Sequence, residues 1–161
     1  MKVIDTKKSS VFHRELDRKY PIFEQGEGVW IVDAEGNRFL DAMSGGAFTA
    51  NIGYGVKDGI DAALEQLTNF PWFHNQKATS EAQEKAAADI AERAPFEDAR
   101  VFFTSSGHDG NETAIRLARK YHYDRGDTDR LKIISFAQAY HGSTFGTLAL
   151  TTGREKAPVH R

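Results

Sequence analysis

The sequence predicts an α/β fold with a mainly parallel sheet and flanking helices. Two short runs, 100–104 and 131–136, are rich in the aromatic and β-branched residues typical of buried strands. A helical pattern lies between them, over about 108–125. A strand, a helix and a second strand in this order form a βαβ unit, and the two strands of such a unit run parallel.

The composition argues against several classes of protein. The 161 residues include 21 Lys and Arg and 23 Asp and Glu, which gives a net charge of −2 with neutral histidines. Nucleic-acid binding needs a basic surplus, which is absent. No apolar run approaches the roughly 18 residues that cross a bilayer, and the absence of Cys excludes disulfides and thiol catalysis. We expect a cytoplasmic globular protein that binds neither nucleic acid nor membrane.

The N-terminal part predicts an arm followed by a β-hairpin. Residues 1–25 are polar and irregular, with one short helix expected over 13–18. From there on, β-forming residues at 29–32 and 38–40 flank the stretch 33–37, Asp-Ala-Glu-Gly-Asn, which has strong turn chemistry. This pattern is typical of two antiparallel strands joined by a tight turn.

A glycine-rich loop and further helices follow the hairpin. Residues 43–55 predict a loop, which either lines a site or only connects two elements. Apolar residues recur at helical spacing over 60–67, and another helix begins after Ser80 and stops at Pro95. The buried face expected for that helix consists of Ala86, Ala87, Ile90, Ala91 and Ala94. A last short helix is expected within 143–160.

The most informative junction is Ser105-Ser106-Gly107, where the first predicted strand enters its helix. A helix start leaves backbone N–H groups unpaired at the positive end of the helix dipole, which suits a phosphate. Gly107 would let the phosphate approach the backbone. The alternative is that Ser106 only caps the helix, with Asp109 where a capping box has Glu. From this junction alone, a cap is the commoner explanation.

A second junction, Tyr140-His141-Gly142, follows the second predicted strand. Ligands of parallel α/β sheets collect at the carboxyl ends of the strands. An aromatic side chain there can stack on a flat ring, and Gly142 leaves room for it; alternatively, Tyr140 packs against its own sheet. Taken together, a phosphate cradle and an aromatic platform at one sheet edge point to a phosphorylated aromatic cofactor.

Four ordered motifs resemble the class III, or omega, aminotransferases from about residue 28 to residue 153. The motifs are Gly28-Val29-Trp30 with Asp33-Ala34-Glu35-Gly36-Asn37, then Ser44-Gly45-Gly46 with Asn51-Ile52-Gly53-Tyr54-Gly55, then Ser106-Gly107-His108-Asp109-Gly110-Asn111-Glu112, and Tyr140-His141-Gly142-Ser143-Thr144. The resemblance implies the N-terminal part of an enzyme that uses pyridoxal 5′-phosphate (PLP). Its fold would be the aspartate-aminotransferase-like fold, or PLP fold type I, with active sites formed across a homodimer interface.

The resemblance also implies roles for individual residues. Cofactor contacts would come from Ser106, Gly107, His108, Glu112, Tyr140, His141 and Gly142. The first three would bind the phosphate, chiefly through backbone N–H groups, Tyr140 would stack on the ring, and His141 and Gly142 would shape the pocket. For Glu112, a solvated acid in the first helical turn is the alternative.

Two residues match the family's substrate pocket, and two depart from its pattern. Phe48 and Tyr54 lie in the glycine-rich loop, in the region that lines the pocket for the amino donor and the oxo acid. The position of His108 is usually Ser or Ala in the family, and Gly110 is usually Ala. The histidine could add positive charge near the phosphate or point away from it.

No catalytic residue is expected in this chain. Transamination needs a lysine that forms a Schiff base with PLP, and the resemblance implies that this lysine lies beyond Arg161. We therefore expect residues 1–55 to be the arm and hairpin of the small-domain or interface region, and 56–161 the truncated first part of the large PLP-binding domain, inactive alone. The alternative is a non-catalytic phosphate- or PLP-binding module. The histidines lack metal-ligand spacing, so no metal is expected.

Overall fold

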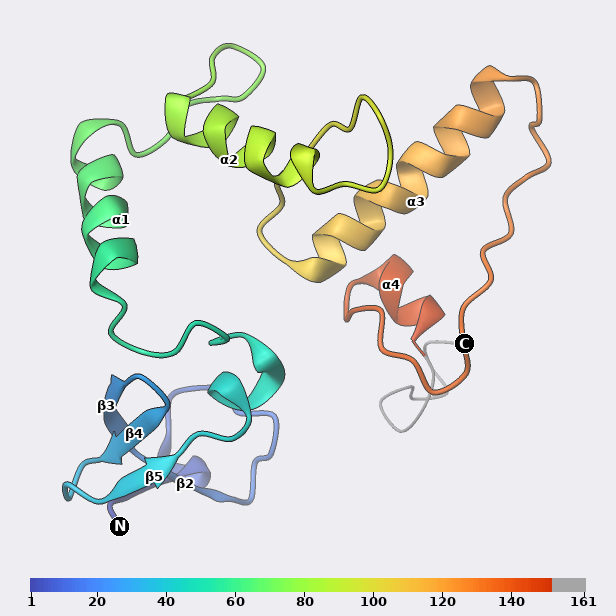
Figure 1. Ribbon diagram of the computed structural model, residues 1–161. Coiled ribbons are helices and arrows are strands. Elements are labelled where there is room, and N and C mark those ends of the chain that lie inside the picture. Colours follow the sequence, from blue (N-terminus) through green and yellow to red (C-terminus); the bar gives the residue numbers. More distant parts are fainter. Residues whose placement is uncertain (152–161) are drawn as a thin grey trace. The chain divides into compact units, whose positions relative to one another are not determined.

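The computed structural model describes residues 1–151 (Figure 1). Backbone contacts divide the chain into two compact units, residues 1–79 and residues from 80 on. Within residues 1–151, the first unit contains the strands, two short helical turns and one long helix, and the second contains helices joined by extended segments. The boundary expected between residues 55 and 56 for the functional domains stays a prediction.

The arm pairs with itself before the hairpin begins. Strands β1 (Val3–Asp5) and β2 (Lys19–Pro21) are antiparallel, and a short 3-10 helix (Thr6–Lys8) follows β1. The helix expected over 13–18 is wrong. The Thr6 N–H and hydroxyl both donate to the Arg18 carbonyl, at 3.0 and 2.9 Å. The backbone of Arg18 is thereby used for a bond across the arm, which competes with the local bonds of a helix.

The predicted hairpin is confirmed. Strands β3 (Phe23–Glu27), β4 (Trp30–Asp33) and β5 (Arg38–Leu40) form an antiparallel sheet in that order. In the turn, the Asp33 carboxylate accepts the N–H groups of Glu35 and Asn37, both at 2.9 Å. Asp33 is 3% exposed. The Asn37 side chain, which donates to the same carboxylate, is the main reason that the pKa of Asp33 is lowered.

The predicted helices are confirmed as well. They are α1 (Lys57–Asn69), α2 (Glu81–Glu92), α3 (Gly107–Asp124) and α4 (Phe145–Leu150). Ser80 caps α2 by accepting the Gln83 N–H at 3.2 Å. The stretch 43–55 is a loop apart from one π-helical turn, Ser44–Phe48. The part of the last predicted helix that falls on 152–160 lies outside the described residues.

The expected parallel sheet is not seen in the described part of the chain. All strand pairs within residues 1–151 are antiparallel, and neither 100–104 nor 131–136 forms a strand. A strand exists only when its backbone pairs with a neighbour, and these two segments have no such neighbour in the described range. Ile134, which a buried strand would cover, is 96% exposed.

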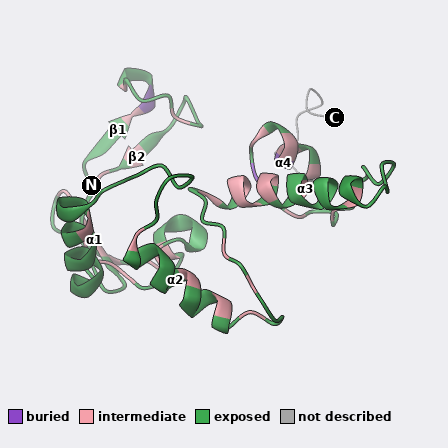
Figure 2. Ribbon diagram, turned by 90° about the horizontal axis from the view of Figure 1, so that it is seen from above, coloured by how far each residue is buried: buried purple, intermediate pink, exposed green. Residues whose placement is uncertain are grey.

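The apolar helix faces are uncovered. No large apolar side chain between residues 1 and 151 is buried, and Figure 2 shows exposed or half-exposed residues along every helix. The burial expected for the α2 face is therefore wrong: Ala86 and Ile90 are exposed. An amphipathic face is buried only when a partner surface packs on it. No helix of the described chain is long and apolar enough to cross a membrane.

Candidate functional site

The N-terminus of α3 offers two unused backbone donors. Ser106 caps the helix: its hydroxyl accepts the Asp109 N–H at 3.2 Å, and its carbonyl accepts the Gly110 N–H at 3.1 Å. The N–H groups of Gly107 and His108 have no acceptor within residues 1–151. Both lie at the positive end of the helix dipole. The cap proposed for Ser106 is thus confirmed, and it leaves donors for an anion.

The space at this helix start admits a ligand, and its hydroxyls are taken up by a carboxylate. A Cβ added to Gly107 would meet no atom within 4 Å, so the backbone there is open to a ligand. The Asp109 carboxylate accepts the Ser106 hydroxyl at 2.7 Å and the Ser105 hydroxyl at 2.8 Å. These two bonds, Ser106 first, lower the pKa of Asp109. Because Asp109 occupies both hydroxyls, an anion would be bound mainly by the backbone.

Residues 141 and 142 pack against the first turns of α3. The Asn111 side-chain amide donates to the His141 carbonyl at 2.7 Å. Gly142 is buried with φ +136°, and a Cβ there would lie 2.5 Å from the Cβ of His108. The structure thereby brings His108, His141 and Gly142 together. Within the described chain, the buried His141 Nε2 has no hydrogen-bond partner.

Tyr140 precedes this packed pair and is itself 62% exposed. Within residues 1–151 it packs against no sheet of its own, because the segment before it, 131–136, is not a strand. Its ring is available to a ligand next to residues that touch α3. Stacking on a cofactor ring stays a prediction.

Glu112 holds the start of α4. Its Oε1 accepts the Thr144 hydroxyl at 2.6 Å and the N–H groups of Gly146 and Thr147 at 3.0 and 3.1 Å. The Thr144 bond is the main reason that the pKa of Glu112 is lowered. Glu112 is therefore not the solvated acid that the alternative described. Its contact with a cofactor stays a prediction.

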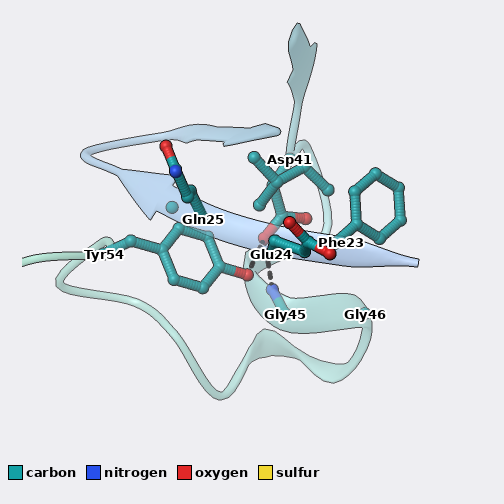
Figure 3. A pocket seen from close by; sticks show the side chains of 9 residues that line it. Phe23, Glu24, Gln25, Asp41, Gly45, Gly46 and Tyr54 are labelled. Carbon is teal, nitrogen blue, oxygen red and sulfur yellow. Dashed lines mark hydrogen bonds between the residues drawn. The ribbon is translucent and has the colours of Figure 1, made fainter. Parts of the chain in front are cut away.

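The first unit contains a cavity of about 520 Å³ (Figure 3). It is lined by Phe23, Glu24, Gln25, Gly26, Ile31, Asp41, Gly45, Gly46 and Tyr54. The Tyr54 hydroxyl donates to Asp41 Oδ2 at 2.7 Å, and the Gly45 N–H donates to the same oxygen at 2.5 Å. The hydrogen bond between Tyr54 and Asp41 is the main reason that the pKa of Asp41 is lowered and the pKa of Tyr54 is raised.

Of the two residues expected in a substrate pocket, Tyr54 and Phe48, one lies at this cavity. Tyr54 lines the cavity, whereas Phe48 is not part of its lining and is 65% exposed. No group of three or more His, Asp or Glu side chains in the described range could hold a metal ion.

Several residues that position the site received no role from the sequence. They are Asp41, Asn111, Thr144, Thr147 and Thr151. Thr144 carried a usable signal, because Ser or Thr before a short apolar run is typical of a helix cap. Asp41, Asn111 and Thr147 bind groups 13 to 35 positions away, to Tyr54, His141 and Glu112, and no local pattern shows such contacts. Thr151 donates to the Gly142 carbonyl nine positions away, which no local pattern shows either.

Comparison with known proteins identifies the family. Residues 12–160 match the family model of the class-III aminotransferases. The chain belongs to this family. The resemblance drawn from the motifs is thereby confirmed. Class-III aminotransferases use PLP, and this chain carries their N-terminal portion.

Curated aminotransferases match most of this chain. It is 42% identical to the uncharacterised aminotransferase YhxA of Bacillus subtilis, over 81% of this chain and 28% of the relative. It is 38% identical to the putrescine–pyruvate aminotransferase of Pseudomonas aeruginosa, over 86% of this chain and 30% of the relative. The chain thus spans about a third of the length of the curated relatives it matches.

Solved structures of aminotransferases share the fold over the same portion. A PMP-bound aminotransferase from Vibrio fluvialis matches with a TM-score of 0.77 and 33% identity, over 88% of this chain and 30% of that one. An (S)-enantioselective omega-transaminase from Thermomicrobium roseum matches with a TM-score of 0.77 and 36% identity, over the same two shares. The aminotransferase fold is therefore shown for this portion.

Proposed function

We propose that the chain is the N-terminal part of a PLP-dependent aminotransferase that moves an amino group from an amine or amino acid to an oxo acid. The whole enzyme would be a cytoplasmic homodimer with the active sites at its interface. The single observation that supports cofactor binding most is the pair of unused N–H groups at Gly107 and His108, beside a glycine open to a ligand.

The residues present fit the cofactor. Gly107 and His108 would donate to its phosphate, and the Nε2 of His141, which is buried and has no partner in residues 1–151, offers a further polar group. The exposed Tyr140 ring would lie against the pyridine ring and hold its orientation. When bound, PLP supplies the electron-accepting ring that transamination needs. The residues of this chain bind and orient; none of them is given a catalytic role.

Phe48 and Tyr54 remain the residues proposed for the substrate pocket. Tyr54 has the cavity beside it as support. Two relatives are named putrescine–pyruvate and taurine–pyruvate aminotransferase, so pyruvate is the first oxo acid to test.

Substituting Gly107 tests the proposal directly. In the full-length protein, Gly107→Val places a branched side chain where the phosphate would bind, at a position where a Cβ meets no other atom within 4 Å. We expect the dissociation constant of PLP to rise at least about tenfold. Gly59→Val is the control, because Gly59 also lies in the first turn of a helix, α1, and a Cβ there also meets no other atom within 4 Å. Equal PLP affinity in wild type and Gly107→Val would show that the phosphate binds elsewhere.

Residues 1–161 alone should not transaminate. The lysine that the reaction requires is expected outside them. The measurement is turnover of the purified chain with several amines and pyruvate or 2-oxoglutarate, with borohydride trapping and peptide mapping. Sustained turnover with one lysine of this chain trapped would contradict the proposal that the Schiff-base lysine lies outside residues 1–161.

A further inference from the structure

Two adjacent residues of α3 hold the two ends of the segment that follows Tyr140. The Asn111 amide donates to the His141 carbonyl, and the Glu112 carboxylate accepts the donors at the start of α4. These bonds join residues 30 to 35 positions apart. We call this pair, Asn111 and Glu112, the α3 clamp.

The start of α4 is built around the Glu112 carboxylate. A Cβ on Gly146 would lie 2.7 Å from both carboxylate oxygens, so glycine is required there for the carboxylate to approach. Thr147, which donates its N–H to Glu112, is fully buried. A six-residue helix such as α4 is too short to be stable by itself. Its position therefore depends on contacts with α3.

The Glu112 carboxylate is suited to this role by its charge. A hydrogen bond to an ionised group is about twice as strong as one between neutral groups. The Thr144 hydroxyl and the two N–H groups all stabilise the charged form, which agrees with the lowered pKa of Glu112. The carboxylate also faces the positive end of the α4 dipole.

The clamp lies one helical turn after the unused donors of Gly107 and His108. It fixes residues 140–142 relative to those donors, with Gly142 already in contact with His108. We propose that Glu112 is a positioning residue that acts through α4, holding residues 140–142 against the start of α3 so that phosphate and ring are bound at a fixed spacing. This inference rests on the proposed function. It replaces direct contact between Glu112 and the cofactor with an action through α4.

The test compares Glu112→Gln with wild type in the full-length protein. Gln keeps the shape of Glu and removes its charge. Glu65→Gln is the control, since Glu65 is an exposed acid of α1. Without PLP, we expect the N–H groups of Gly146 and Thr147 to exchange hydrogen about tenfold faster in Glu112→Gln. With PLP, we expect the dissociation constant to rise about tenfold and the visible circular dichroism of the bound cofactor to change.

A second variant perturbs the same contact from the other side. Gly146→Ala pushes a methyl group into the Glu112 carboxylate and should produce both effects. In the double variant, the two losses should not add, because each breaks the same contact. This variant keeps the inference testable if Glu112→Gln fails to fold.

The outcomes separate the inference from the proposed function. Wild-type protein without affinity for PLP would overturn the proposed function itself. Normal wild-type affinity, with unchanged exchange at Gly146 and Thr147 in the variants, would overturn the inference. Faster exchange with unchanged PLP affinity and an unchanged cofactor spectrum would also overturn it, because Glu112 would then serve stability only.

Discussion

The hairpin of the first unit and the α3–α4 region of the second are held together over different distances along the chain. In the hairpin, the Asp33 carboxylate binds groups two to four positions away. Around α4, Asn111 and Glu112 bind groups 30 to 35 positions away. The hairpin turn can form wherever its five residues occur, whereas the clamp needs the chain to return to α3. We expect the two regions to respond differently to substitution.

The largest effect is expected at Gly142, where the returning chain touches α3. A Cβ at φ +136° is strained, and it would lie 2.5 Å from the Cβ of His108 and against Thr147. Gly142→Ala should therefore destabilise the full-length protein by about 3 kcal/mol and weaken PLP binding. Thermal unfolding and PLP titration are the measurements.

Gly59→Ala is the control for that variant. Gly59 lies inside α1 with open space around it, so alanine there should stabilise by about 0.5–1 kcal/mol. Gly142→Ala with the stability and PLP affinity of wild type would mean that residues 141 and 142 do not pack on α3 in the whole protein.

Substituting Tyr140 should weaken PLP binding without changing the stability of the protein. The side chain is exposed, so Tyr140→Ala should leave the melting temperature close to that of wild type. PLP binding should weaken by roughly 1–2 kcal/mol, as expected for a lost stacking contact. PLP titration of both proteins measures this. Unchanged affinity would reject the stacking role.

How far apart the interacting residues lie in the sequence also decides what could be predicted from the sequence. Strands β4 and β5, the helices and the Ser106 cap could be predicted because turn residues, helical spacing and capping residues act on near neighbours. The parallel sheet and the buried face of α2 could not, because both depend on partner surfaces that residues 1–151 do not supply. The helix expected over 13–18 failed because Arg18 pairs with Thr6, twelve positions away.

Substituting Asp33 should have a local effect confined to the hairpin. Asp33→Ala removes the acceptor of the Asn37 N–H, so exchange of that N–H should accelerate about tenfold while PLP affinity stays that of wild type. Because the folded-state pKa of Asp33 lies below its ordinary value of 3.8, its contribution is present above that pH and is lost as the pH falls through the folded pKa. The wild-type hairpin should therefore loosen in acid. A slow Asn37 N–H in Asp33→Ala would contradict this account.

The smallest effect is expected for Tyr54→Phe, which probes a contact of intermediate range. The Tyr54 hydroxyl and the Asp41 carboxylate are 13 positions apart. Two backbone bonds to Gly28, at 2.8 and 3.0 Å, hold Tyr54 independently of its hydroxyl. Its ring also fills the space beside Gly26, where a Cβ would lie 2.6 Å away. The substitution should therefore remove one hydrogen bond and leave the ring in place.

The consequence of Tyr54→Phe should appear in the titration of Asp41. The Tyr54 bond is the largest cause of the lowered pKa of Asp41, so that pKa should rise toward 3.8 in the variant, while the Gly45 and Met43 bonds keep it from rising fully. Above that pH the carboxylate is charged in both proteins; as the pH falls, the variant should protonate first and depend less on pH for its stability. NMR titration of Asp41 measures this, with Tyr123→Phe, an exposed tyrosine of α3, as control. An Asp41 pKa equal to that of wild type would show that the Asp41 carboxylate is held by the nearby backbone N–H groups of Met43 and Gly45 alone. Its contacts would then be as short in sequence range as those of Asp33 in the hairpin turn.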